Sequence, residues 1–165
     1  MSRIRGKDTT PEKVVRSLLH RLGYHFRLHV KIPVPQLKPR GAKGSLRGST
    51  LNPQLSQRRL ITPDIVLIKH RVAIFVHGCF WHRHPGCKNC TTPTHRRAWW
   101  LKKLNGNATR DKLHQKALRK LGWHPVVIWE CQTEKPKKFA RLHAKLERTL
   151  SAAKGQKEGG NPNRR

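Results

Sequence analysis

Two short apolar runs, at residues 65–68 and 72–76, constrain the fold of this chain more than any other feature. Only Lys69, His70 and Arg71 separate them. Apolar runs of this length with a brief turn between them are typical of a hairpin of buried strands. Buried strands need other layers of structure packed over them. The hairpin therefore predicts a sheet with helices around it.

The other elements follow from apolar periodicity and turn residues. Thr9 and Glu12 have the spacing of a capping box, and Gly23 is a typical helix end. The pattern predicts a helix over 9–22, a half-buried strand over 24–30, helices near 99–104 and over 108–121, a strand over 123–129 and a helix over 139–150. We expect Asn105-Gly106-Asn107 to separate the two middle helices. This order predicts the α/β class, with a mixed central sheet flanked by helices on both faces.

The length of 165 residues suits one domain, which we place at 1–150. Within it, residues 33–61 are basic, contain no acid and mix proline, glycine and serine, so we expect a flexible insertion there. The polar residues 151–165 are expected to form a disordered tail. A membrane span needs about 20 apolar residues. The chain has no such run and no signal peptide, so we expect a cytoplasmic protein.

The chain carries 37 Lys and Arg against 8 Asp and Glu, a formal net charge of +29. A charge of this size predicts a polyanionic partner, because phosphate neutralisation and counterion release dominate nucleic-acid binding. A structural protein of the ribosomal kind would have a similar composition. The charge therefore indicates nucleic acid, but it does not separate a binding protein from an enzyme.

Four residues have the side chains and the spacing of a metal site. Cys79, His84 and Cys87 fall in one loop that follows a predicted strand, and Cys131 follows another. If the two strands are neighbours, three thiolates and one imidazole can converge into a closed tetrahedral zinc site of the structural type. Cys90 could replace Cys87 as a ligand, and thiols that bind nothing are the simpler alternative.

Several other residues could take part in chemistry. Asp64 stands at the entrance of an apolar strand, where a carboxylate suits magnesium, although an aspartate after proline is also common in turns. His82 and His77 could act as a general base beside a metal-bound water, bind zinc or contact phosphate. Asp111 could orient one of these histidines, or it could be a helix-surface acid beside Arg110.

Two aromatic pairs, Phe80-Trp81 and Trp99-Trp100, are also candidates for function. Adjacent rings on a regular element cannot both face one core. Proteins that distort DNA insert apolar wedges between base pairs, which gives such rings a use. The alternative is one core ring and one surface ring in each pair, and it is stronger for Trp99 and Trp100 than for Phe80 and Trp81.

A set of local sequences is shared, in order, with one known family. The set comprises residues 1–12, Pro63-Asp64, the string from Val72 to His82, Asn105-Gly106-Asn107 with Arg110-Asp111, and Val127-Ile128-Trp129-Glu130-Cys131. On these residues the chain resembles the very short patch repair (Vsr) mismatch endonucleases. The resemblance covers about residues 1–32 and 62–132.

The resemblance implies a restriction-endonuclease-like fold and a nick in one DNA strand 5′ to the thymine of a T:G mismatch, which arises when 5-methylcytosine deaminates. It implies a catalytic Mg²⁺ bound by Asp64 and by the backbone carbonyl of Val76. It implies that His82 is the general base and that Asp111 assists it. His77 would lie in the same pocket, and Glu12 would be an acid near the active site.

The resemblance also implies a structural Zn²⁺ and an aromatic wedge. The implied zinc ligands are Cys79, His84, Cys87 and Cys131. The implied residues that enter the duplex are Phe80, Trp81 and Trp100. As partners it implies double-stranded DNA with a T:G mismatch and mismatch-repair proteins, in a monomer that works beside a cytosine methyltransferase on the DNA of the cytoplasmic nucleoid.

Three departures from the family pattern stand out. The basic stretch at 33–61 is longer than the expected link before Pro63-Asp64, and Cys90 is an additional thiol. Restriction-type nucleases usually carry Glu-x-Lys after the metal aspartate, whereas this chain has Val76-His77-Gly78 there, so histidine chemistry must replace the lysine. A non-catalytic, zinc-stabilised DNA-binding protein is the alternative function. The joint presence of Asp64, His82 and Asp111 favours the enzyme, because a binding protein needs none of them.

Overall fold

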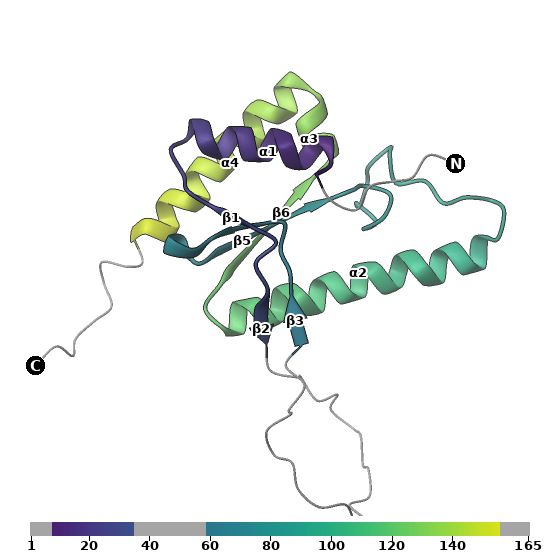
Figure 1. The fold of residues 1–165 in the computed structure, drawn as a ribbon. Coiled ribbons are helices and arrows are strands. Elements are labelled where there is room, and N and C mark those ends of the chain that lie inside the picture. Colours follow the sequence, from purple (N-terminus) through teal and green to yellow (C-terminus); the bar gives the residue numbers. More distant parts are fainter. Residues whose placement is uncertain (1–7, 35–58, 156–165) are drawn as a thin grey trace, which may run out of the picture.

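The fold is a sheet between two layers of helices (Figure 1). The structure, a computed structural model, describes residues 8–34 and 59–155. Its elements are α1 (Thr10–Arg21), β1 (Arg27–Leu28), β2 (Ile32–Val34), β3 (Arg59–Ile61), β4 (Ile65–Leu67), the 3-10 helix η1 (Ile68–His70), β5 (Val72–His77), α2 (Arg97–Lys120), β6 (His124–Trp129), α3 (Cys131–Glu134) and α4 (Pro136–Gly155).

The main sheet is mixed and has the strand order β1-β4-β5-β6. Antiparallel pairing joins β1 to β4 and β4 to β5, so the predicted hairpin of buried strands is confirmed. Pairing between β5 and β6 is parallel and places His77 opposite Trp129 at the ends of the two strands. A separate antiparallel ribbon pairs β2 with β3. Parallel pairing thus brings the chain after His77 and the chain after Trp129 to one edge of the sheet.

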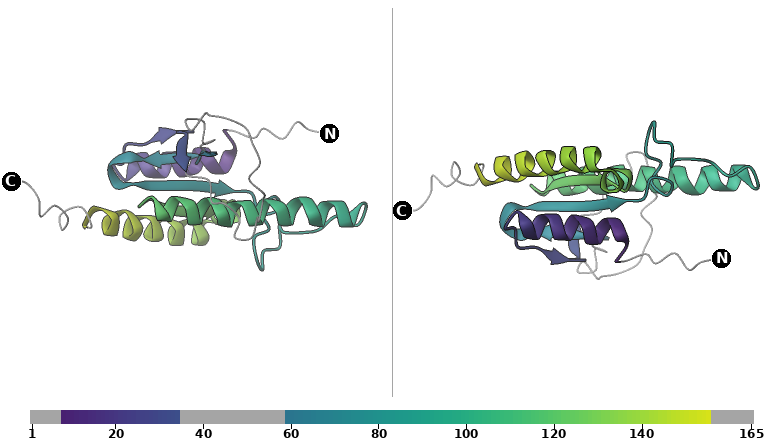
Figure 2. Two further views of the ribbon diagram at one scale, coloured as in Figure 1. Left: turned by 90° about the horizontal axis from the view of Figure 1, so that it is seen from below. Right: turned by 90° about the horizontal axis from the view of Figure 1, so that it is seen from above.

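Alternate residues of the central strands face two different cores, as period-2 side-chain alternation requires. Val72 and Ile74 of β5 pack with α1 and α4, whereas Ala73 and Phe75 pack with α2 and with the β2–β3 ribbon. Figure 2 shows α1 and α4 side by side over one face of the sheet, and α2 extending past the sheet on the side where β5 ends. The predicted α/β class with helices on both faces is confirmed.

The middle helix differs from its prediction. We expected Asn105-Gly106-Asn107 to break it, but α2 is continuous from Arg97 to Lys120. Gly106 lies on the exposed side of the helix, where a missing side chain leaves no packing defect, and the buried Leu104 and Leu118 hold the helix against the protein. Tertiary packing therefore outweighs the weak helix propensity of the triplet.

Three further boundaries also differ. The strand expected over 24–30 is reduced to Arg27–Leu28, because His29 has a left-handed φ of 50° that ends the extended chain. Helix α4 begins at Pro136 and continues through 151–155, where the buried Ala153 adds one more contact to its apolar face, so the expected irregular tail does not begin at Ser151. The short helix α3 was not predicted. The ends of the predicted insertion form the β2–β3 ribbon, while residues 35–58 and 156–165 lie outside the described residues.

Within the described ranges, none of the helices combines the length and the apolar character needed to cross a membrane.

The continuity of α2 gives the first prediction. A Cβ added at Gly106 would meet no atom within 4 Å, so Gly106→Ala should raise the free energy of unfolding by about 0.5–1 kcal/mol by favouring the helix. Gly122 has a φ of +71°, so Gly122→Ala should instead lower that free energy, by about 1 kcal/mol. Urea denaturation of both variants measures the difference. A loss of stability in Gly106→Ala would show that the helix is broken at the triplet.

Candidate active site and metal centre

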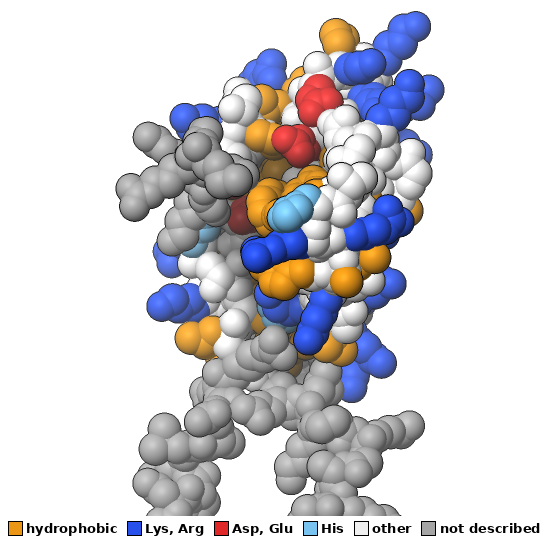
Figure 3. Space-filling model, turned by 90° about the vertical axis from the view of Figure 1, so that its right-hand side faces the viewer, with side chains coloured by type: hydrophobic (Ala, Val, Ile, Leu, Met, Phe, Trp, Pro, Cys, Tyr) orange, Lys and Arg blue, Asp and Glu red, His pale blue; other side chains and the backbone are white. Residues whose placement is uncertain are grey.

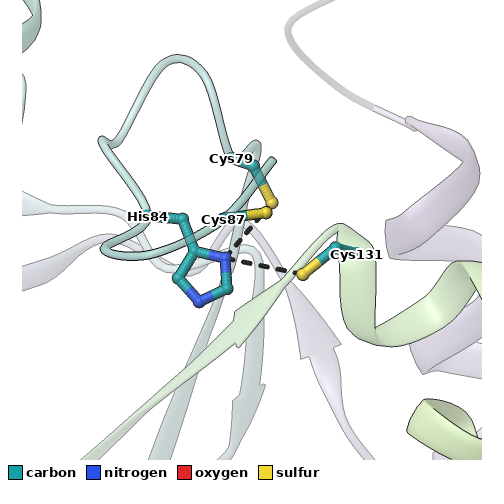
Figure 4. A group of neighbouring side chains, drawn as sticks. All are labelled: Cys79, His84, Cys87 and Cys131. Carbon is teal, nitrogen blue, oxygen red and sulfur yellow. Dashed lines mark hydrogen bonds between the residues drawn. The ribbon is translucent and has the colours of Figure 1, made fainter. Parts of the chain in front are cut away.

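The four predicted metal ligands lie together at the edge where β5 and β6 end (Figure 4). One ligand atom from each of Cys79, His84, Cys87 and Cys131 falls within 4.8 Å of the others. His84 Nδ1 lies 3.5 Å from Cys79 Sγ and 3.5 Å from Cys131 Sγ. The parallel β5–β6 pair explains the convergence, because Cys79 and Cys131 each follow the last residue of a paired strand by two positions.

The geometry fits a tetrahedral metal ion. Bonds of about 2.3 Å to sulfur and about 2.0 Å to nitrogen separate those ligand atoms by roughly 3.5 Å when the angles are tetrahedral. Burial raises the pKa of the Cys79 thiol to about 12 and also raises that of Cys131, so without a cation these two groups stay protonated. Burial, followed by the nearby Lys138 charge, lowers the pKa of His84, which favours the neutral imidazole that metals bind.

The structure also separates Cys87 from Cys90. Cys87 joins the cluster, whereas Cys90 belongs to no group of metal-binding side chains among the described residues. Hydrogen bonding to the backbone of Asn89 lowers the pKa of Cys87, so it ionises more readily than an ordinary thiol. Of the two alternatives left open by the spacing, the described geometry favours Cys87.

A carboxylate that the sequence analysis left without a role ties this cluster to the sheet. Glu130 accepts a hydrogen bond from the Cys79 N–H at 3.2 Å, and its own N–H donates to the His77 carbonyl at 2.9 Å. Trp129, the residue before it, stacks on the His84 ring at 4.2 Å with an interplanar angle of 7°. The Trp129-Glu130-Cys131 string therefore holds the loop in three ways: through the stack of Trp129 on His84, through the Glu130 carboxylate and through the Cys131 thiol in the cluster.

A cleft of about 920 Å³ lies beside the metal-ligand cluster and collects the remaining predicted residues. Its lining comes from the N-terminal turn of α1, the start of β4, the end of β5, the following loop and the middle of α2. The predicted residues among its walls are Glu12, Asp64, Val76, His77, Phe80, Trp81, His82 and Asp111. Residues separated by a hundred positions in the chain thus meet in one place.

Asp64 and Val76 form one wall of this cleft. The Val76 N–H donates to Asp64 Oδ2 at 2.7 Å, and the Asp64 N–H donates to the Ile74 carbonyl at 3.1 Å. In an extended strand the N–H and C=O of one residue point to the same edge, so the Val76 carbonyl faces the side on which Asp64 lies. Burial raises the pKa of Asp64, against the effect of the Val76 hydrogen bond. A carboxylate and a carbonyl placed together are oxygen ligands that suit a hard divalent cation, which would also offset the burial of the charge.

His82 and Asp111, which also line the cleft, form an ion-pair-type contact, with 2.5 Å between His82 Nδ1 and Asp111 Oδ2. Burial disfavours the charged form of Asp111, but the hydrogen bond with His82 and the nearby positive charges together outweigh burial and lower the pKa of the carboxyl. An ionised Asp111 accepts this hydrogen bond, so His82 Nδ1 carries the proton and His82 Nε2 is left as an acceptor. The arrangement is that of a histidine oriented to remove a proton.

His77 contacts His82 directly, and Asn107 holds the residue before it. The His77 ring stacks on the His82 ring at 3.9 Å with an interplanar angle of 9°, and burial with the nearby His82 charge lowers the pKa of His77 to about 4. His77 is therefore neutral near pH 7. Asn107 donates to the Trp81 carbonyl at 3.2 Å, one helical turn before Asp111. The unbroken α2 thus fixes the loop through Asn107 and the histidine through Asp111.

Glu12 lines the same cleft but is held by its own helix. It is 3% exposed, and its carboxylate accepts hydrogen bonds from Thr9 Oγ1 at 2.8 Å and from Arg16 Nη2 at 2.9 Å. The predicted capping box is thereby confirmed. Both carboxylate oxygens have protein partners, and the nearby Glu12 charge adds to the rise in the pKa of Asp64.

The three predicted wedge residues form one aromatic cluster. Ring centroids lie 5.1 Å apart for Phe80 and Trp81, 5.5 Å for Phe80 and Trp100, and 6.0 Å for Trp81 and Trp100. Trp99, which the resemblance left out, contacts Trp100 at 4.9 Å and is 52% exposed. The amino group of Lys103 lies over the Trp81, Trp99 and Trp100 rings. Figure 3 shows Lys and Arg side chains spread over this side of the molecule, with apolar and histidine side chains between them.

A mixed sheet flanked by helices, with a Cys and His cluster where two of its strands end, defines a restriction-endonuclease-like protein. A model of the family described as DNA mismatch endonuclease Vsr matches residues 53–89. Over 132 residues the chain is 40% identical to type II nicking enzyme V.XorIIP of Xanthomonas oryzae pv. oryzae, which covers 80% of this chain and 77% of that protein.

Two further relatives agree. Type II nicking enzyme V.NmeAIP of Neisseria meningitidis is 31% identical over 132 residues, covering 80% of this chain and 75% of its own. DNA mismatch endonuclease Vsr of Escherichia coli is 34% identical over 131 residues, covering 79% of this chain and 67% of its own. The chain belongs to the Vsr family of DNA mismatch endonucleases and nicking enzymes. It is therefore a DNA endonuclease, a hydrolase whose substrate is DNA.

The geometry of the cluster gives the second prediction. We expect one metal ion per chain, lost in Cys87→Ser and retained in the matched variant Cys90→Ser, because only Cys87 reaches the cluster. Loss of the ion should also lower the melting temperature, since binding at such a site is coupled to folding. Metal analysis and thermal denaturation measure both effects. Full metal content in Cys87→Ser together with loss of metal in Cys90→Ser would show that Cys90, and not Cys87, is the ligand.

Proposed function

We propose that the protein nicks one DNA strand 5′ to the thymine of a T:G mismatch by Mg²⁺-dependent hydrolysis of a phosphodiester. The observation that carries the proposal is the single cleft in which Asp64, Val76 and the His82–Asp111 pair lie beside the aromatic cluster. A protein that only binds DNA has no use for a buried carboxylate and an oriented histidine in one cleft. The alternative function, a non-catalytic DNA-binding protein, therefore explains these residues less well.

In the proposed reaction, Asp64 and the Val76 carbonyl would hold the magnesium ion. When bound, the ion supplies Lewis-acid chemistry at the phosphate and stabilises the negative charge that develops there. His82 Nε2 accepts a proton from the attacking water, whose oxygen forms a bond to phosphorus as the bond to the leaving oxygen breaks. Asp111 stabilises the resulting imidazolium through the His82 Nδ1 hydrogen bond.

The other cleft residues prepare this arrangement. His77, which is neutral near pH 7, stacks on His82 without adding a positive charge that would oppose protonation of its neighbour. The charge of Glu12 lies near Asp64 and favours a cation there. The end of β5 carries Val76-His77-Gly78 where restriction-type nucleases have a lysine, and His82 takes over proton transfer.

We propose that the Cys79, His84, Cys87 and Cys131 cluster holds a structural Zn²⁺. Three thiolates and an imidazole form a soft, closed ligand set that leaves no position for a reacting water. The Lys138 charge, which favours the ionised forms of Cys87 and Cys131, balances part of the excess negative charge. Phe80, Trp81 and His82 lie between the first and second ligands, so the ion would fix the loop that presents them.

Mismatch selectivity is proposed to come from the aromatic cluster. A T:G pair is stacked and paired more weakly than a Watson–Crick pair, so inserting a ring beside it costs less unstacking energy. Phe80, Trp81 and Trp100 would enter the duplex there. The proposed setting is nucleoid DNA in the cytoplasm, where a monomer acts with mismatch-repair proteins.

The third prediction concerns Asp64. Asp64→Asn should abolish nicking of a T:G duplex and leave binding of that duplex within a few-fold, because an amide is a poor magnesium ligand and the basic surface is unchanged. Wild type and variant are compared on T:G and T:A duplexes with and without magnesium. Glu147→Gln, on the exposed face of α4, makes the same charge change away from the cleft and should cleave normally. Near-normal cleavage by Asp64→Asn would overturn the metal assignment.

The fourth prediction concerns Trp81. Trp81→Ala should weaken binding to the T:G duplex by about 1–3 kcal/mol, the usual value of a base–aromatic stack, and should change binding to T:A little. Trp99→Ala removes a ring of the same cluster that does not line the cleft, so it should have the smaller effect. Affinities are measured on folded, metal-loaded protein. Equal weakening on both duplexes would make Trp81 a packing residue.

A further inference from the structure

A second cleft, of about 560 Å³, lies on the other side of the His82–Asp111 pair. It shares His77, His82 and Asp111 with the first cleft, so these three side chains lie where the two clefts adjoin. The proposed chemistry makes no use of this space. Its other polar walls include Arg83, Thr109 and Lys112, which are suited to an anion.

Arg83 has two unusual features. Its φ is 53°, a left-handed conformation that has a conformational cost for any residue with a Cβ. Its Nη1 atom is shielded from solvent, and within the described residues nothing accepts a hydrogen bond from it. Burying a guanidinium N–H without an acceptor is unfavourable, and such groups are rare in folded proteins. Arg83 therefore destabilises the fold in two ways, through its left-handed backbone conformation and through a buried N–H group that has no acceptor among the described residues.

Arg71 shows what a structural arginine looks like in the same backbone conformation. Its φ is 52°, and its side chain donates to the carbonyls of Leu121 and Gly122 at 2.6 Å and 3.2 Å. Those bonds tie the β4–β5 turn to the end of α2. Arg83 has no comparable partner among the described residues, so the fold gains no such tie from it.

We propose that Arg83 binds a backbone phosphate of the cut strand in the second cleft, next to the scissile phosphate in the first. Phosphate oxygens match the fork of guanidinium donors, and bonds between these charged groups are stronger than neutral ones. His82 lies where the two clefts adjoin. A DNA strand bound in both clefts would therefore pass the general base His82 with two neighbouring phosphates held in place. Arg83 thereby sets the register of the strand against His82. The proposal rests on the proposed function in taking duplex DNA as the ligand and the first cleft as the place of the scissile phosphate.

The first test measures binding in the absence of magnesium, so it does not depend on cleavage. Arg83→Gln should reduce the slope of log affinity against log salt by about 0.9, the value of one phosphate contact, and should weaken binding about tenfold at low salt. Arg148→Gln on α4 removes the same charge away from both clefts and should leave the slope unchanged. If the two substitutions change the salt slope equally, Arg83 contributes only to the net charge and the proposed phosphate contact is wrong.

The second test locates the phosphate. Single phosphates on either side of the nick are replaced in turn by neutral methylphosphonates, and each duplex is titrated with wild type and with Arg83→Gln. At one linkage the replacement should weaken DNA binding by wild type about tenfold and leave binding by Arg83→Gln unchanged. Both changes remove the same contact, the one between Arg83 and that phosphate. If no linkage shows this coupling, the proposal is wrong, whether or not the protein nicks T:G duplexes.

The third test separates binding from folding. Arg83→Gly relieves the left-handed backbone and the unpartnered N–H, so its denaturation midpoint should equal or exceed that of wild type while DNA affinity falls. Metal content is measured alongside, because the residue lies next to His84. A lower midpoint with unchanged DNA affinity would make Arg83 a structural residue and overturn the proposal.

Discussion

The parallel pairing of β5 with β6 is the interaction on which the rest of the structure depends. It sets His77 opposite Trp129, and from that register the two Cys-bearing segments emerge at the same edge of the sheet. The metal-ligand cluster is therefore a direct result of strand order, since an antiparallel β6 would send Cys131 to the far end. Both strands are buried in the core, so the hydrophobic burial that stabilises the sheet also fixes the position of the cluster.

The loop after β5 is held between this cluster and α2. On one side it is tied down by Cys79 and Glu130, and on the other by Asn107 and Asp111. Backbone hydrogen bonds within the loop, such as the one from the His82 N–H to the Gly78 carbonyl at 3.1 Å, form its local turns. The outside contacts then hold those turns against the sheet and α2. As a result, His82 lines the same cleft as Asp64, although the two residues come from different parts of the chain.

The fold class could be read from local pattern, because the runs at 65–68 and 72–76 have one reasonable structure and the capping box marks the first helix. Failures arose where tertiary contacts outweigh local preference, as in α2, where Asn105-Gly106-Asn107 is spanned by a helix anchored through Leu104 and Leu118. The site residues were found through family resemblance and ligand chemistry. Spacing alone left Cys87 and Cys90 equivalent, and no pattern in the sequence gave Glu130 its contact with Cys79 or Arg83 its left-handed backbone. Those features depend on which segments meet in space.

The antiparallel pairing of β2 with β3 has a consequence for how such chains change over evolutionary time. Ile32 faces Ile61 and Val34 faces Arg59, so the two ends of the intervening segment are held by a ladder that packs on Val66 and Phe75. Once the ends of a segment are fixed, doubling its length costs only about 0.6 kcal/mol of closure entropy. Insertions and deletions between these strands therefore leave the start of β4, and with it Asp64, in register.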